Sequence, residues 1–329
     1  MAVNEKELRR YLNVIKRAVD LIEGMLENDD GGMLEQLMQP EVQIVPRMPF
    51  QEAAPIKPTP VVVQPEPQKG ISDARKKHIG DLTSIDCWPE AVPAHLVNGD
   101  GPSEEDQVNR ANSVLDFMVD RNLEGGAFLD FGCGEGWVTQ EASKRGVVEC
   151  LGYDIAHDDN WNSRHGAKFT SNFDTVPHDH FDYVMLYDVL DHCEDPMLLM
   201  SQVKSVLKPG GAVFARCHPW TSKHAMHLWK HGLNQAYLHL FLTWDEITET
   251  IGKPPMFTRT EKDPIEAYHW WFNDFKMIKE RFSKEDVSEF FFVPSFKELL
   301  ANEQQIPIDQ IDGFLDLMRI SFVDYVLEK

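Results

Sequence analysis

The chain has 329 residues, 42% of them hydrophobic, which is enough for one large core or two modest ones. Its formal net charge of −22 makes nucleic acid unlikely as the main partner, because an acidic surface repels a phosphate backbone. The five cysteines form no C-x-x-C pair and predict reduced thiols. No apolar run approaches the ~18 residues of a membrane span, and no signal-peptide core opens the chain. We therefore expect a cytoplasmic protein with no membrane partner.

A heptad pattern fills the N-terminal arm over residues 4–28. Its apolar seam alternates spacings of four and three residues and consists of Leu8, Leu12, Ile15, Val19, Ile22 and Leu26. Asn4 can cap this helix, with Glu7 three residues on, and the Asp-Asp-Gly-Gly run at 29–32 ends it. We assign residues 1–38 to this helix. It either docks on its own domain, forms a homo-oligomer as a coiled coil, or binds another protein.

Residues 39–72 are expected to be a flexible linker. Eight prolines lie between residues 39 and 70, and such a segment stays extended because it cannot bury enough apolar surface to fold. Residues 71–100 then read as an irregular entry to the domain that we assign to 73–329. A helix is predicted from Ser103 to about Arg121.

The stretch that follows organises the rest of the chain. Ala127–Phe131 predicts a short buried strand and Val138–Lys144 a helix, with a glycine-rich turn between them. The glycines of this turn are Gly132, Gly134 and Gly136. Alternate glycines let the backbone pass close to a ligand, although the same run also suits a plain tight turn. A dinucleotide-binding turn would need its third glycine at Trp137 instead.

The run D-x-G-x-G-x-G from Asp130 to Gly136 resembles the first motif of class I S-adenosylmethionine-dependent methyltransferases. The resemblance implies S-adenosyl-L-methionine as cofactor. It also implies that the helix at 103–121 forms part of a lid over the cofactor. Simple packing of that helix on the sheet is the alternative.

Asp154 ends a second predicted strand that begins at Val147. A carboxylate at the carboxyl end of the second parallel strand can accept hydrogen bonds from both hydroxyls of a ribose. A helix cap is the alternative role for an acid at this position.

A third strand is predicted over 167–171, and in the methyltransferase pattern the residues after it face the adenine. In this sequence they are Asn172, Phe173 and Asp174, which are also common turn residues. Together, the residues expected to bind the cofactor are Asp130, Gly132, Cys133, Gly134, Gly136, Trp137, Asp154, Ile155, Asn172, Phe173, Asp174 and Tyr187.

A second motif runs from His180 to His192 and is followed by Leu-Lys-Pro-Gly-Gly at 207–211. It is similar to the family's fourth strand, its V-L-E-H-like turn, a helix, and the turn before the fifth strand, which we place at 212–216. Asp191 stands where glutamate is commoner. The resemblance extends continuously from residue 127 to about 217.

A histidine-rich insert at about 217–243 follows the fifth strand. Ligands bind at the carboxyl edge of such sheets, so the insert is placed to form the acceptor pocket. His224, His227 and His231 would share one face of a helix. They read as ordinary polar lining, as a metal site or as a source of catalytic groups; we assign no metal. The candidate general bases are His218, His192 and His224, with His218 favoured by its position.

The C-terminal part is expected to complete the sheet. Thr243–Glu246 predicts a cap leading a helix to Ile251. Residues 268–282 read partly as a sixth strand, a helix follows from about Ser283, and 319–327 reads as the last strand. The expected fold class is α/β: a doubly wound, Rossmann-like, seven-stranded sheet with an antiparallel last strand.

The resemblance implies methyl transfer by in-line displacement, most simply to a small-molecule acceptor. One alternative is a methyltransferase of a protein or nucleic acid recruited through the N-terminal arm. Another is a catalytically silent assembly module, against which the intact glycine turn and Asp154 argue.

Overall fold

The computed structural model describes residues 72–93, 103–117, 122–252, 257–258, 260, 263–293 and 295–329. The heptad helix predicted at 1–38, and the predicted linker up to residue 71, lie outside the described residues. Within the described ranges, no helix has both the length and the apolar character needed to cross a membrane.

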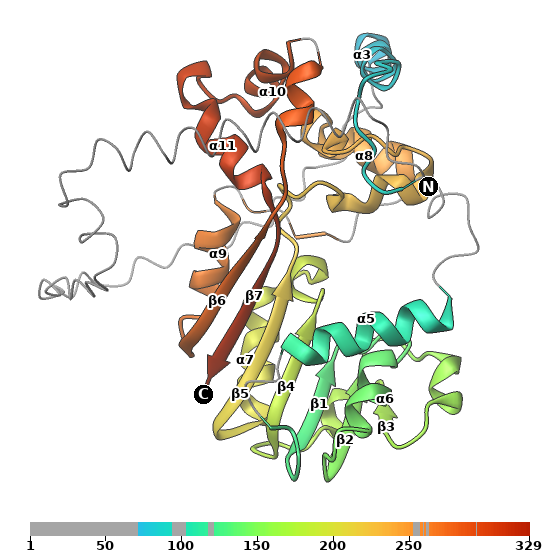
Figure 1. Cartoon of the computed structure of the whole chain (residues 1–329), viewed down its shortest axis with the longest axis vertical. Coiled ribbons are helices and arrows are strands. Elements are labelled where there is room, and N and C mark those ends of the chain that lie inside the picture. The colour runs from blue at the N-terminus through green and yellow to red at the C-terminus, as the bar shows by residue number, and fades with distance from the viewer. Residues whose placement is uncertain are drawn as a thin grey trace, which may run out of the picture. The chain divides into compact units, whose positions relative to one another are not determined.

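A seven-stranded sheet runs through the domain in the order β3-β2-β1-β4-β5-β7-β6 (Figure 1). Its strands are β1 (Ala127–Phe131), β2 (Glu149–Tyr153), β3 (Lys168–Thr170), β4 (Phe181–Tyr187), β5 (Leu207–Cys217), β6 (Lys276–Lys284) and β7 (Ile320–Glu328). The first five pair in parallel, and β7 is antiparallel to both of its neighbours. The predicted fold class is confirmed. Strand order reverses between β1 and β4, and ligands bind such sheets at the carboxyl ends beside that point.

Helices cover both faces of the sheet because strand side chains alternate between them. Phe128 and Met185 face one side, in a core shared with α5 and α6. Leu129 and Val184 face the other, in a core shared with α7 and α9. These helices are α5 (Glu104–Phe117), α6 (Trp137–Ser143), α7 (Pro196–Val206) and α9 (Pro264–Trp271). Burial on both faces explains why the central strands are almost continuously apolar.

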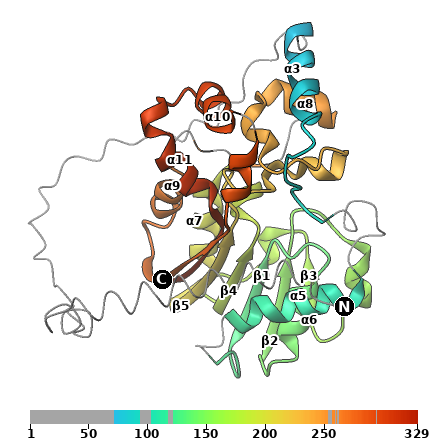
Figure 2. The same ribbon diagram turned by 45° about the horizontal axis from the view of Figure 1, so that its top comes forward.

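A second hydrophobic core builds what we call the cap, formed by residues 72–93, 217–252 and 285–318. Its elements are α3 (Asp73–Thr83), η4 (Ala225–His231), η5 (Leu238–Phe241), α8 (Trp244–Ile251), η6 (Ser288–Phe292), α10 (Phe296–Gln304), η7 (Ile308–Gln310) and α11 (Ile311–Met318). Tyr237 and Phe241 are buried at its centre. The cap helices gather at the end of the sheet where β5 passes into the insert (Figure 1, Figure 2). The predicted acceptor insert is therefore one part of a larger cap.

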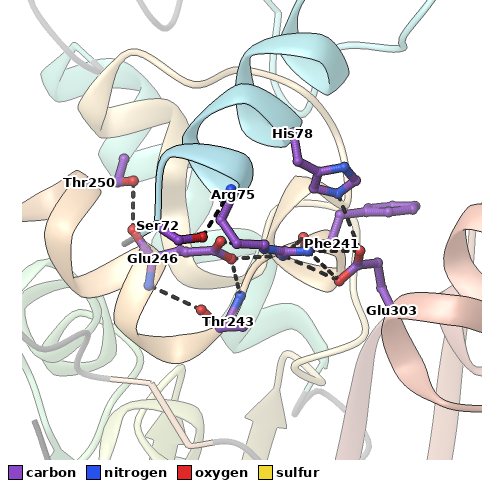
Figure 3. A network of polar contacts seen from close by, with 8 residues as sticks. All are labelled: Ser72, Arg75, His78, Phe241, Thr243, Glu246, Thr250 and Glu303. Atoms are coloured by element: carbon purple, nitrogen blue, oxygen red, sulfur yellow. Dashed lines mark hydrogen bonds and ion pairs between the residues drawn. The ribbon is translucent and has the colours of Figure 1, made fainter. Parts of the chain in front are cut away.

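Arg75 fastens α3 to the rest of the cap (Figure 3). Its guanidinium bonds both carboxylate oxygens of Glu246 on α8, at 2.6 and 2.9 Å, and reaches Glu303 on α10 at 3.0 Å. Glu246 also completes a capping box with Thr243 at the start of α8. Because residues 73–83 form the helix α3, the irregular entry predicted for 71–100 is wrong over that range.

Two predictions in the C-terminal part are also wrong. Residues 264–271 form α9, with Asp263 as its cap, so the sixth strand begins only at Lys276. Tyr268, Trp271 and Phe272 are spaced for one helix face and are buried together in the sheet core, whereas we read the aromatic-rich stretch at 268–282 partly as a strand. The helix expected from Ser283 does not start there, because β6 continues to Lys284.

The Pro-Gly-Gly turn predicted at 209–211 lies inside β5 rather than before it. Pairing with β4 passes from Phe181–Leu207 to Tyr183–Ala212, so a step of five positions along β5 matches a step of two along β4. Gly210, with φ +75°, takes up this irregularity, and the strand then continues to Cys217.

Candidate functional site

The glycine turn projects from the carboxyl end of β1. Gly134 has φ +49°, and a side chain built on it would meet no atom within 4 Å, so the space in front of it is open. Gly136, with φ +82°, differs: a Cβ there would lie 2.6 Å from the ring of Phe169. Gly136 is thus required by packing, whereas Gly134 borders room for a ligand to pass close to the backbone.

Asp154 ties the end of β2 to this turn. One carboxylate oxygen accepts the N–H of Gly134 at 2.9 Å, and the other accepts that of Ala156 at 3.1 Å. Each oxygen keeps a further lone pair for a ligand hydroxyl. The next residue, Ile155, is 77% exposed, so an apolar surface adjoins the carboxylate. The structure therefore brings Gly134, Asp154 and Ile155 together, as a nucleoside site needs.

The residues predicted to face an adenine lie on one turn after β3. Asn172 caps that turn by accepting the N–H of Asp174 at 3.1 Å. The ring of Phe173 lies 5.5 Å from that of Tyr153 and 5.9 Å from that of Phe131. Phe173 thus leans on the sheet, whereas Asp174 is exposed. Their contact with a base stays a prediction.

Asp130 is buried beneath the glycine turn and accepts a hydrogen bond from the Thr139 hydroxyl at 2.7 Å. Burial raises the pKa of Asp130 to about 7. Cys133 is also buried, with its N–H bonded to the Tyr153 carbonyl. Asp130 and Cys133 therefore support the glycine turn from its buried side. Trp137 lies on its outer side, with the Arg164 guanidinium 3.5 Å from the centre of its indole ring.

Arg110 links α5 to the carboxyl end of β4. It donates to the Tyr187 hydroxyl at 2.8 Å and to the Asp188 carboxylate at 2.9 Å. On its other face α5 buries Ala111, Val114 and Leu115 in the core over the sheet. The expected packing of α5 on the sheet is confirmed. Its role as a lid remains a prediction, and Arg110 is the residue through which it can be tested.

Asp188 was not singled out from the sequence. It ends β4 as Asp154 ends β2, so an acid after a buried strand was the signal that could have found it. Its backbone is in the left-handed region at φ +55°, which is uncommon for a residue other than glycine.

His218, which directly follows β5, is held from both sides. Nδ1 lies 2.9 Å from the Ser321 carbonyl, and Nε2 lies 3.1 Å from the Asp188 carboxylate. A carbonyl only accepts, so Nδ1 carries a proton. Burial lowers the pKa of His218, but Asp188 outweighs it and the net shift is upward. Asp188 thus favours the protonated form of the ring, which has no lone pair to accept a proton, so this geometry does not favour the general base expected at His218.

The expected shared helix face of the insert histidines is wrong. Met226 and His227 have φ of +63° and +51°, which breaks the helical period, and His231 is exposed. What forms instead is a histidine cluster of His192, His218, His224 and His227. Neighbouring ring centres are 5.3 Å apart for His218 and His224, 6.5 Å for His224 and His227, and 5.1 Å for His227 and His192.

Two members of the cluster are neutral at neutral pH. Burial, reinforced by the charge of His218, lowers the pKa of His224 to about 4. Burial and the charge of Lys230 lower the pKa of His227 to about 3. Nearby, burial and then the charge of Asp188 raise the pKa of Asp191 to about 6. Among the residues that the structure describes, no three or more His, Cys, Asp or Glu side chains are grouped to hold a metal ion.

Comparison with known families matches residues 104–260 to a profile described as a methyltransferase domain. A mitochondrial ubiquinone biosynthesis O-methyltransferase of Dictyostelium discoideum is 27% identical over 159 residues, which cover 40% of this chain and 49% of that protein. A ubiquinone biosynthesis O-methyltransferase of Parvibaculum lavamentivorans is 26% identical over 131 residues, covering 37% and 52%. The chain thus spans about half the length of these curated relatives.

Solved structures are similar at lower identity. An S-adenosylmethionine-dependent methyltransferase of Mesorhizobium loti is 17% identical, with a TM-score of 0.41, over 66% of this chain and 96% of that one. One from Archaeoglobus fulgidus is 15% identical, with a TM-score of 0.41, over 68% and 94%.

Proposed function

Residues 104–260 form a class I S-adenosylmethionine-dependent methyltransferase domain, and from this premise we propose that the chain methylates a hydroxyl group of a small molecule. The observation that carries the proposal is the position of the neutral His224 imidazole, 5.3 Å from that of His218 at the carboxyl end of β5. The Gly134–Asp154 pair lies at the carboxyl ends of β1 and β2, which run parallel to β5 and end at the same edge of the sheet. The names of the relatives, which are O-methyltransferases, support an oxygen acceptor.

The residues around Gly134 suit the cofactor. The open space at Gly134 admits a ligand against the backbone, Asp154 offers free lone pairs to ribose hydroxyls, and Ile155 offers an exposed apolar surface. S-adenosylmethionine, when bound, supplies an electrophilic methyl group on a sulfonium. The protein has then to orient the acceptor oxygen and exclude water from it.

The histidine cluster suits a neutral hydroxyl acceptor. His224 is a free base at neutral pH, so its ring can accept the hydrogen bond of a hydroxyl and take up its proton as the oxygen becomes a better nucleophile. His218 and Asp188 form a fixed ion pair behind it, 5.3 Å away between the two imidazole rings.

Calorimetry with S-adenosylmethionine tests the cofactor first. We expect micromolar binding by the wild type, a loss of at least tenfold in Asp154→Asn, and no change in Asp159→Asn, an exposed neighbour of equal charge. Absence of binding by the wild type would overturn the proposal and favour a silent module.

Methyl transfer from tritium-labelled cofactor then tests the acceptor, with catechol, benzyl alcohol and benzylamine as matched probes. Transfer to the hydroxyl probes, reduced in His224→Gln, is the expected result. Transfer to benzylamine alone would overturn the hydroxyl assignment, and label found only in protein or RNA would favour a macromolecular acceptor.

A further inference from the structure

Two consecutive residues of η4 have a left-handed backbone conformation, which is unfavourable for residues that carry a side chain. Met226 has φ +63° and His227 has φ +51°, and neither is glycine. Left-handed conformation costs folding free energy at each such residue, because Cβ crowds the carbonyl oxygen. Strain of this kind persists only where the surroundings impose it, and it concentrates at functional sites.

The surroundings of the turn do impose it. Ala225, Met226 and Leu228 are all buried in the cap core. The N–H of His227 also donates to the His224 carbonyl at 3.2 Å. The side chains on both sides of His227 are anchored in the cap core, whereas the His227 ring is turned toward the sheet edge. There its ring lies 5.1 Å from that of His192, which closely follows β4.

Aromatic rings surround the imidazole of His227 on several sides. Phe257 and Trp229 meet it edge to face at 6.2 and 6.4 Å, and His224 lies parallel to it at 12°. No described residue makes a hydrogen bond or ion pair with its ring nitrogens. The ring is only half-buried, so its nitrogens stay accessible and can exchange a hydrogen bond with a ligand group.

We propose that the strained Met226–His227 turn presents the His227 imidazole to the acceptor, where it binds a neutral hydroxyl group and selects for it. The inference rests on the proposed function and adds a specificity-determining residue to it. The flat aromatic neighbours favour a planar, ring-borne hydroxyl such as a phenol.

Substitutions at one position separate the backbone from the imidazole. His227→Gly suits the left-handed conformation and removes the ring, whereas His227→Asn also tolerates it and keeps a side chain that can hydrogen-bond. Gln305→Gly is the matched control, because Gln305 has φ +54° at the end of α10. We expect the melting temperature to stay level or rise in both glycine variants, since each relieves strain.

Calorimetry with catechol, on protein saturated with S-adenosylhomocysteine, supplies the functional readout. We expect catechol to bind about tenfold more weakly in His227→Gly, within about threefold of wild type in His227→Asn, and unchanged in Gln305→Gly. Affinity for S-adenosylhomocysteine is expected to be the same in all four proteins.

Each contrary result has a distinct meaning. Wild-type protein that fails to bind S-adenosylhomocysteine contradicts the proposed function itself. Protein that binds it, but whose affinity for catechol is undetectable or insensitive to His227→Gly, overturns the role of His227 and leaves the cofactor assignment standing.

Discussion

Asp188 and His218 join the ends of two neighbouring parallel strands, with a carboxylate oxygen 3.1 Å from Nε2 of the imidazole. Each side chain is less than one-fifth exposed, so water screens the pair weakly. Asp188 is held further by Arg110, and His218 by the Ser321 carbonyl. The Asp188–His218 pair therefore links the carboxyl ends of β4 and β5, and Arg110 and Ser321 hold it in place.

Asp188→Asn is expected to destabilise the protein by about 3 kcal/mol near pH 5.5, because it leaves a buried imidazolium without its counter-ion. His218 has a pKa raised above its ordinary 6.5, so its share of the stability is complete below pH 6.5 and is lost as the pH rises through the raised value. Burial opposes the ionisation of Asp188, but the combined effect of His218 and the nearby arginines is larger and lowers the pKa of Asp188 below its ordinary 3.8. The stability that the Asp188 carboxylate contributes is therefore lost only as the pH falls below 3.8.

Urea denaturation at several pH values measures this effect. The difference between wild type and Asp188→Asn should be greatest between pH 3.8 and 6.5 and should shrink above that range. Asp312→Asn is the control, since its pair with Lys297 is exposed and contributes less than about 0.5 kcal/mol. A difference that does not change with pH would show that the pair does not depend on a titration of His218 in this range, contrary to the prediction.

Arg110→Gln tests whether α5 acts as a lid. We expect affinity for S-adenosylhomocysteine to fall about threefold to tenfold, because the helix loses its bonds to Tyr187 and Asp188 at the sheet edge. Arg145→Gln is the matched control, as Arg145 binds Asn112 and Asp116 of the same helix instead of Tyr187 and Asp188. Equal effects of the two variants would mean that α5 contributes by packing alone.

Arg75→Met should weaken the cap by about 3 kcal/mol, since it leaves the carboxylate of Glu246, only 2% exposed, without its counter-ion. Lys76→Met on the same helix should cost less than about 0.5 kcal/mol, because its pair with Glu249 is exposed. Urea denaturation monitored by tryptophan fluorescence compares the two. Similar midpoints would show that the contacts drawn in Figure 3 do not hold α3 in place.

The sequence predicted the sheet because its signals are local. Buried apolar strands, the alternate glycines and the acid at Asp154 each follow from neighbours in the chain. The helix α9 was missed because its aromatic residues were read as strand formers, although Tyr268, Trp271 and Phe272 have the spacing of a helix face. The Asp188–His218 pair and the histidine cluster depend on strands and turns that meet only in the folded protein. The strain at Met226 and His227 could not be predicted from the sequence, since methionine does not mark a left-handed turn and histidine does so only weakly.

Alanine substitutions in the glycine turn separate packing from ligand access. Gly132→Ala should cost more than about 2 kcal/mol of stability, because the new Cβ would lie 2.5 Å from the Val189 side chain on a backbone with φ +82°. Gly134→Ala should cost only about 1–2 kcal/mol, as its Cβ meets open space and the strain is confined to the backbone. The same methyl group would occupy the path of the ligand. Cofactor affinity should therefore fall at least tenfold in Gly134→Ala when measured by calorimetry at a temperature where the variant is folded. An affinity within twofold of wild type would place the cofactor away from Gly134 and from the Asp154 carboxylate bonded to it.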